Sequence, residues 1–159
     1  MRAMRRLLLV VPALLVVAGC GAPEPSDLIS VLDASPGERD ALPTIEGRTV
    51  PEEVVADSAR YLGETSVARY WVALDGSDRV CIVQAVGGGE EPTAVGSSCA
   101  PPDRFADEGV WGEVSAGGPA AQGLVAPDDF DLADAPMGED WVMVGDNLAA
   151  PADQVDATS

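Results

Sequence analysis

The sequence has no histidine and no lysine, and aromatic residues make up only 4% of its 159 residues. Without histidine, neither a Ser-His-Asp nor a Cys-His catalytic arrangement can form. Without lysine, a glycine-rich phosphate loop of the usual kind is excluded. Nine basic residues stand against 27 acidic ones, so the cationic face that nucleic-acid binding needs is missing and no nucleic-acid partner is expected.

A long apolar run is also missing. Leu7 to Val17 is the longest uncharged apolar stretch, and it is shorter than the roughly 20 residues that a membrane-spanning helix needs. It follows Arg2, Arg5 and Arg6, and it ends in small residues. A basic start, a short apolar core and small residues before a break are typical of a secretory signal peptide.

The break itself is Val17-Ala18-Gly19-Cys20. This segment resembles the lipobox of bacterial lipoproteins, in which the cysteine receives a diacylglyceryl group and becomes the first residue after cleavage. The resemblance implies that residues 1–19 are a signal peptide. It also implies that Cys20 is lipidated and holds the protein on the outer face of the cell membrane, where the lipid is the membrane partner. The alternative is an ordinary signal peptide that happens to end beside a cysteine.

Removal of residues 1–19 from the 159 would leave 140, which is the length of one domain. The removed part holds three of the nine arginines and none of the 27 acidic residues, so the remaining chain has six bases and a net charge of −21. Anionic headgroups would repel such a body, so the lipid rather than the protein surface must hold it at the membrane.

The three cysteines are an odd number, which normally leaves one thiol to explain. Assigning Cys20 to lipid leaves Cys81 and Cys99, and an exported protein meets conditions oxidising enough for a disulfide. Both lie in strand-like runs that flank the turn-forming stretch 87–92, so we expect a Cys81–Cys99 disulfide between neighbouring strands. A redox-active pair is the alternative, but the Cys-x-x-Cys spacing is absent.

The sequence predicts a flexible tether over residues 20–42, a folded domain over 43–150 and a disordered acidic tail over 151–159. Thr49, Pro51 and Glu52 resemble a helix start, and the helix would end near residues 57–60. A second short helix is expected over 101–108, with Gly109 as its stop. Strands are expected at 60–64, 67–74, 80–86, 94–99, 110–115, 123–126 and 141–144, with Asp75-Gly76 as a hairpin turn. The fold class is therefore a small, mainly antiparallel α+β domain with one or two short helices and one disulfide.

The order of several short motifs resembles that of small exported domains of actinobacteria. They run from Ser58-Ala59-Arg60-Tyr61-Leu62-Gly63 through Cys99-Ala100-Pro101 to Val144-Gly145-Asp146-Asn147-Leu148, and they cover about residues 58–150. In that group the segment near residue 126 is closer to Val-Pro-Asp-Gly, so Ala126 and Asp129 depart from the pattern. The resemblance implies a fold and a structural disulfide, and it implies no activity.

The densest acidic cluster is Asp128-Asp129-Phe130-Asp131-Leu132-Ala133-Asp134. Carboxylates suit calcium, so Asp128, Asp129, Asp131 and Asp134 are weak candidate ligands. An EF-hand loop starting at Asp129 fails, because Ala133 replaces a ligand and Asp134 replaces the required glycine. A solvated acidic loop is the simpler interpretation, and no cofactor is expected.

Trp71, Trp111 and Trp141 each fall in an expected strand. Aromatic residues on a sheet usually belong to the core, but two that face outward together would stack on a sugar or a peptide. We therefore expect a non-enzymatic, lipid-anchored module that binds a protein or polymer of the cell envelope. The competing hypothesis is a hydrolase of envelope polymer that uses two carboxyl groups about 5 to 9.5 Å apart.

Overall fold

A computed structural model describes residue 21 and residues 23–87, 91–135, 137 and 140–155. Two antiparallel sheets of four strands each form the body, together with two short α-helices. The α+β fold class expected from the sequence is confirmed.

The first sheet has the strand order β3-β4-β5-β6 and consists of β3 (Arg60–Glu64), β4 (Ala68–Leu74), β5 (Val80–Val86) and β6 (Ala94–Ala100). The second sheet has the order β7-β8-β10-β9 and consists of β7 (Val110–Val114), β8 (Ala121–Val125), β10 (Leu148–Pro151) and β9 (Trp141–Met143). The remaining elements are α1 (Pro25–Leu28), α2 (Pro102–Glu108), the short pair β1 (Thr44–Ile45) and β2 (Arg48–Thr49), and the 3₁₀ turns η1 (Ser30–Asp33), η2 (Glu38–Asp40), η3 (Ala56–Ser58), η4 (Leu132–Asp134) and η5 (Ala152–Gln154).

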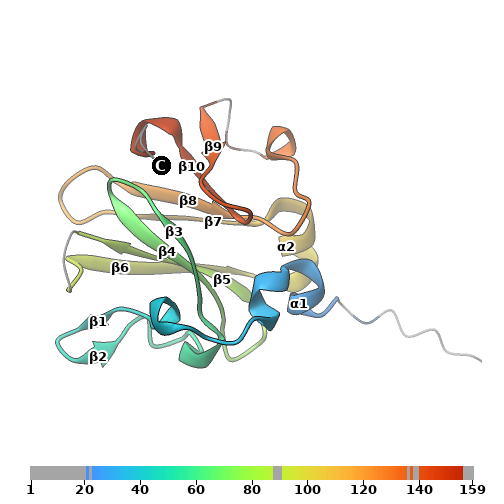
Figure 1. Cartoon of the computed structure of the whole chain (residues 1–159), viewed down its shortest axis with the longest axis horizontal. Helices are drawn as coiled ribbons and strands as arrows, with labels where there is room; N and C mark the ends of the chain where they lie inside the picture. The colour runs from blue at the N-terminus through green and yellow to red at the C-terminus, as the bar shows by residue number, and fades with distance from the viewer. Residues whose placement is uncertain (1–20, 22, 88–90, 136, 138–139, 156–159) are drawn as a thin grey trace, which may run out of the picture.

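The two sheets stack on each other, and the N-terminal segment covers the far side of the first sheet, so that the molecule has three layers (Figure 1). Side chains alternate along a strand, so each strand of the first sheet contributes to two cores. Tyr70, Val72 and Ile82 face the second sheet. Trp71 and Val83 face the N-terminal layer, where Leu42, Val54 and Ala59 cover them. The first sheet is therefore buried on both faces.

Glycines allow the two sheets to approach closely. A Cβ atom at Gly123 of β8 would lie 2.6 Å from Cε1 of Tyr70, and one at Gly112 of β7 would lie 2.7 Å from Oε1 of Gln84. Gln84 itself is buried, and its side-chain amide donates to the carbonyl oxygens of Gly112 (3.1 Å) and Ala121 (3.4 Å). The contact between the sheets thus depends on positions without a side chain.

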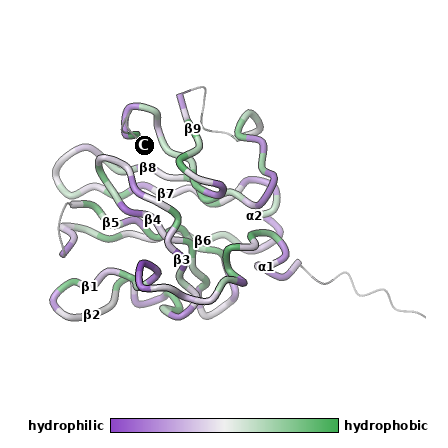
Figure 2. The backbone as a smooth tube through the Cα atoms, viewed as in Figure 1, coloured by the Kyte–Doolittle hydropathy of each residue, from purple (hydrophilic) through white to green (hydrophobic). Residues whose placement is uncertain are grey.

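The expected flexible tether over residues 20–42 is wrong for residues 25–42. Pro25 and Ile29 are buried, and Ile29 belongs to the core between the sheets. Figure 2 shows the hydrophobic segment that follows α1 lying along the domain, and the hydrophilic turn η2 after it. In the sequence, the apolar residues between Leu28 and Leu32 form a small patch in a polar segment. In the structure they pack against the core between the sheets.

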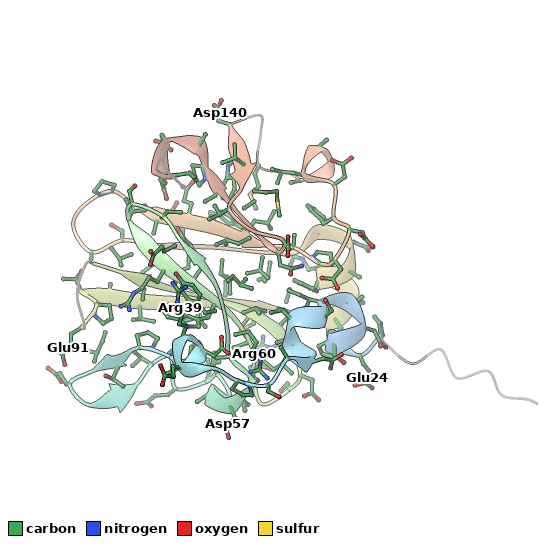
Figure 3. The ribbon with its side chains drawn as sticks, viewed as in Figure 1. Glu24, Arg39, Asp57, Arg60, Glu91 and Asp140 are labelled. Carbon is green, nitrogen blue, oxygen red and sulfur yellow. A yellow bond between two sulfur atoms is a disulfide. The ribbon has the colours of Figure 1, made fainter. Side chains whose placement is uncertain are left out.

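Arg60 holds this segment in place. It is 7% exposed, and its guanidinium donates to the backbone oxygens of Ala34 (2.8 Å), Ala59 (2.7 Å), Asp57 (3.1 Å) and Leu32 (3.4 Å). A buried charge is tolerated only when its donors are satisfied, and here backbone carbonyls satisfy them. Figure 3 shows Arg60 beneath the N-terminal layer.

Two further boundaries differ from the sequence prediction. The expected helix starting near Thr49 is the single 3₁₀ turn η3, and Val54 instead forms a bridge with Asp75. The expected tail begins too early, because Pro151 belongs to β10 and Gln154 bonds to the body through the carbonyl oxygen of Ala120 (3.0 Å). The part of that tail over residues 156–159 lies outside the described residues.

Candidate functional site

Trp71 is a core residue, which corrects its role as a candidate for ligand stacking. It is 3% exposed, and its indole N–H donates to the carbonyl oxygen of Arg39 at 3.0 Å. Its ring and the Tyr61 ring form a T-shaped pair whose centres are 5.7 Å apart. The N-terminal layer covers it. Ligand access to Trp71 is therefore closed in this structure.

Trp111 is the exposed tryptophan, with 43% of its surface accessible. Strand alternation explains this, because Val110 and Gly112 of β7 are buried toward the first sheet while Trp111 and Glu113 point to the opposite side. An indole exposes a large apolar area, so Trp111 presents an apolar surface to solvent.

Trp141 is half-buried and belongs to the same face of the second sheet as Trp111. The register shows this, since Trp111 pairs with Leu124, Leu124 with Ala149, and Ala149 with Met143, two residues after Trp141. The two tryptophans nevertheless lie on strands at opposite edges of that sheet. They do not form one stacking platform.

A groove of about 440 Å³ lies beside Trp111. It is formed where the end of β6, helix α2 and the start of β7 meet Met137, and its principal side chains are Ser98, Cys99, Arg104, Glu108, Trp111 and Met137. Gly109 ends α2 with a φ of 68°, a left-handed conformation that glycine adopts freely, and so turns the chain directly into β7. That turn places the last residues of α2 next to Trp111.

Arg104 and Glu108 form an ion pair at the mouth of the groove. The Nε–Oε2 distance is 3.0 Å, and the two side chains are 69% and 55% exposed. An exposed pair four residues apart on a helix contributes only about 0.3–0.5 kcal/mol. A ligand therefore displaces either partner at little cost.

The predicted disulfide is confirmed. Cys81 of β5 and Cys99 of β6 are directly opposite in the register, and their sulfur atoms are bonded at 2.03 Å. The bond closes a loop with a sequence separation of 18 residues, for which chain entropy gives a stabilisation of about 3 kcal/mol. Cys99 also forms part of the groove wall, so the disulfide fixes one side of it.

Two of the candidate calcium ligands, Asp128 and Asp131, have structural hydrogen-bond partners. Asp128 fastens the N-terminal segment, because it accepts hydrogen bonds from the Ser30 backbone N–H (3.0 Å) and the Asn147 side chain (2.9 Å). Burial raises the pKa of Asp128, but these hydrogen bonds outweigh it and the pKa lies below its ordinary value. Asp131 caps η4 by accepting from the Ala133 N–H at 2.9 Å, and the side chain of Asp134 lies outside the described part.

Within the described ranges, only Asp75, Cys81 and Cys99 bring three potential metal-ligand atoms within 4.8 Å of one another. Both sulfur atoms of that trio are in the disulfide. Among the described side chains of the acidic segment, Asp128 is thus a structural clasp for the N-terminal segment and Asp131 caps a turn.

Two other hollows lack an exposed aromatic residue in their walls. One of about 540 Å³ lies among turns at one end of the sheets, including residues 64–69, and another of about 500 Å³ lies among Asp27, Asp107 and the segment 127–131. Of these three hollows, the groove beside Trp111 is the one whose wall has an exposed indole together with charged side chains of both signs.

Comparison with known proteins supplies no relative: no protein-family model, curated protein or solved structure matches this chain. In the part of the chain that the structure describes, no helix has the length and apolar character needed to cross a membrane. Cys20 and the signal peptide expected over residues 1–19 lie outside the described residues.

Sequence reasoning named Trp111 but missed Arg104, Glu108 and Met137 as its neighbours. Arg104 and Glu108 are four residues apart on the expected second helix, and Gly109 ends that helix. Because only Gly109 and Val110 separate Glu108 from Trp111, the sequence contains the signal that would place this pair near Trp111. Met137 was not, because it reaches the groove from a long segment without regular secondary structure.

Proposed function

We propose that this protein is an exported lipoprotein, anchored through Cys20 on the outer face of the cell membrane, that binds a protein partner of the cell envelope in the groove beside Trp111. The observation that carries the binding part is the exposed indole of Trp111 at a groove with charged walls. Tryptophan and arginine are enriched where proteins bind proteins, and both occur here.

The anchoring part is supported by the basic start, the short apolar core and the segment Val17-Ala18-Gly19-Cys20. It also agrees with the disulfide, because Cys81 and Cys99 pair with each other and leave Cys20 as the one cysteine available for lipid. Secretion through a signal peptide would place that disulfide in an oxidising compartment.

The competing hydrolase hypothesis finds no proton donor in Glu53, Asp75 or Asp128. A carboxylate-based glycosidase needs a carboxyl group whose pKa is raised so that it can donate a proton. A hydrogen bond from Ser97 lowers the pKa of Glu53. In Asp75 and Asp128, burial raises the pKa, but hydrogen bonds outweigh this effect and lower it. The pKa values of Glu53, Asp75 and Asp128 therefore all lie below the ordinary value.

The test of anchoring is Cys20→Ala. We expect this variant to lose lipid, measured as the mass of the mature N-terminal peptide, and to leave the membrane fraction or stay unprocessed. Membrane retention together with cleavage before residue 20 would overturn the anchoring proposal.

The test of binding is a photo-crosslinking residue at position 111 in intact cells, compared with one at Glu91, an exposed residue. We expect one discrete adduct from position 111 and none from position 91, with the crosslinked partner peptide identified by mass spectrometry. Equal, diffuse crosslinking from both positions would rule out the groove as a binding site.

A further inference from the structure

The charge of the molecule restricts what the groove can bind. The full sequence has 27 acidic and nine basic residues, so an anionic ligand or a second copy of this chain meets repulsion at every approach. The arginines are already included in that balance of charge, and each described arginine side chain also has a contact within the domain. These contacts are those of Arg39 over the Tyr61 ring, Arg60 on backbone carbonyls, Arg69 over Trp71, Arg79 with Asp75, and Arg104 with Glu108.

The groove presents two kinds of group that attract a cation. One is the exposed face of Trp111, since an indole attracts a guanidinium or ammonium group placed over it. The other is carboxylate. Glu108 lies in the groove wall, and Glu113, which accepts a hydrogen bond from the Gln122 side-chain amide at 2.7 Å, lies outside the wall but points to the same side of β7 as Trp111. The protein already uses this type of contact internally, because Arg39 lies 4.3 Å from the centre of the Tyr61 ring.

Building on the proposed function, we propose that the groove beside Trp111 recognises a lysine or arginine side chain in an extended segment of the partner protein. The cation lies over the indole, and the carboxylates of Glu108 and Glu113 neutralise it. In the free protein Arg104 forms an ion pair with Glu108. Because that ion pair is exposed and weak, the incoming cation replaces Arg104 as the partner of Glu108. The apolar stem of the incoming side chain lies beside Met137 and the disulfide at Cys99.

The probe is the peptide amide Gly-Lys-Gly-Lys-Gly, titrated into the full mature chain and followed by NMR of the tryptophan indole N–H signals. We expect the Trp111 signal to shift and Trp111→Leu to weaken binding about fivefold. Trp141→Leu is the matched control, because it makes the same change at the other edge of the same sheet, and we expect it to leave the affinity unchanged. The peptide with glutamine in place of lysine should not bind.

A second pair of variants separates local recognition from general attraction to an acidic protein. Glu108→Gln with Glu113→Gln removes one charge from the groove wall and one from β7 beside Trp111, and Glu46→Gln with Glu91→Gln removes two charges elsewhere. All four side chains are exposed. We expect the first pair to weaken peptide binding several-fold more than the second. Equal effects of the two pairs, or equal effects of Trp111→Leu and Trp141→Leu, would overturn the proposal of a cation site.

The two proposals fail in different ways. If position 111 still crosslinks to a discrete partner while the lysine peptide does not bind at Trp111, the binding function stands and its selectivity for a cation is wrong. If neither the crosslink nor the peptide contact appears, the proposed function itself fails.

Discussion

At the residue scale, single polar side chains join segments that are far apart along the chain. Arg60 binds backbone carbonyls of the N-terminal layer, and Asp128 fastens the same layer from the other sheet. Asp75 has a local role: it is 5% exposed, and it accepts hydrogen bonds from the Ser77 (2.8 Å) and Arg79 (3.0 Å) N–H groups in the β4–β5 hairpin.

Asp75 gives a prediction for pH dependence. Burial raises its pKa, but the hydrogen bonds from Arg79 and Ser77 and the Arg79 ion pair at 2.6 Å outweigh it and lower the pKa. A carboxylate with a lowered pKa stabilises the fold above its unfolded pKa of about 3.9, and this stabilisation is lost as the pH falls through the folded value. We expect Asp75→Asn to reduce the free energy of unfolding by about 1–2 kcal/mol at pH 7 and by much less at pH 2.5.

The measurement is urea denaturation of both proteins at several pH values. Asp57→Asn is the control, because Asp57 is an exposed aspartate on the surface (Figure 3) and its loss should change little at either pH. A cost for Asp75→Asn that is the same at pH 7 and pH 2.5 would show that its charge does not contribute.

At the element scale, the contact between the two sheets depends on small residues at fixed register positions. Gly123 of β8 faces Tyr70 and Ile82, so the ring of Tyr70 packs close to the backbone of the other sheet. The hydroxyl of Tyr70 then reaches the carbonyl oxygen of Gln122 at 3.0 Å. A larger residue at Gly123 would displace both.

Gly123→Ala tests this contact. The new Cβ would lie 2.6 and 2.9 Å from two ring carbons of Tyr70, so we expect a loss of about 2 kcal/mol in the free energy of unfolding from overpacking. Gly118→Ala is the matched control, because nothing lies within 4 Å of its added Cβ. Thermal unfolding should show a clearly lower Tm for Gly123→Ala and an unchanged Tm for Gly118→Ala. Equal Tm values for the two variants would mean that the close contact at Gly123 does not contribute to stability.

At the scale of the whole molecule, the folded N-terminal layer changes how the proposed anchor positions the domain. Pro25 is buried, so residues 21–24 are the segment between Cys20 and the fold. Counted from Cys20 to Glu24, five residues of fully extended chain reach at most about 18 Å. The end of the domain near Glu24 would therefore stay close to the membrane. Glu91 lies at the opposite end, as Figure 3 shows.

This orientation gives a prediction for the lipidated protein in vesicles. We expect a fluorophore at residue 24 to transfer energy efficiently to an acceptor lipid, and one at residue 91 to transfer much less. Insertion of twenty Gly/Ser residues after Gly21 should reduce the difference, because a flexible linker lets the domain turn and move away. Equal transfer from both positions without the insertion would contradict a short tether.

Local patterns in the sequence determined the body of the domain. A nearly continuous apolar run placed β5 at residues 80–86, and Asp75-Gly76 marked the hairpin turn. Gly109 ended α2, and the two remaining cysteines predicted the disulfide. These signals are local because backbone conformation and strand alternation are set by neighbouring residues.

Only the tertiary structure decided which surfaces are covered. The polar composition of residues 25–42 suggested a tether, but Ile29 and Leu42 are buried because the first sheet offers apolar surface on both faces. The same packing buries Trp71 and leaves Trp111 exposed, although both lie in strands of similar pattern. Burial depends on residues distant in the chain, so the groove beside Trp111 becomes visible only once α2, β6, β7 and Met137 are assembled.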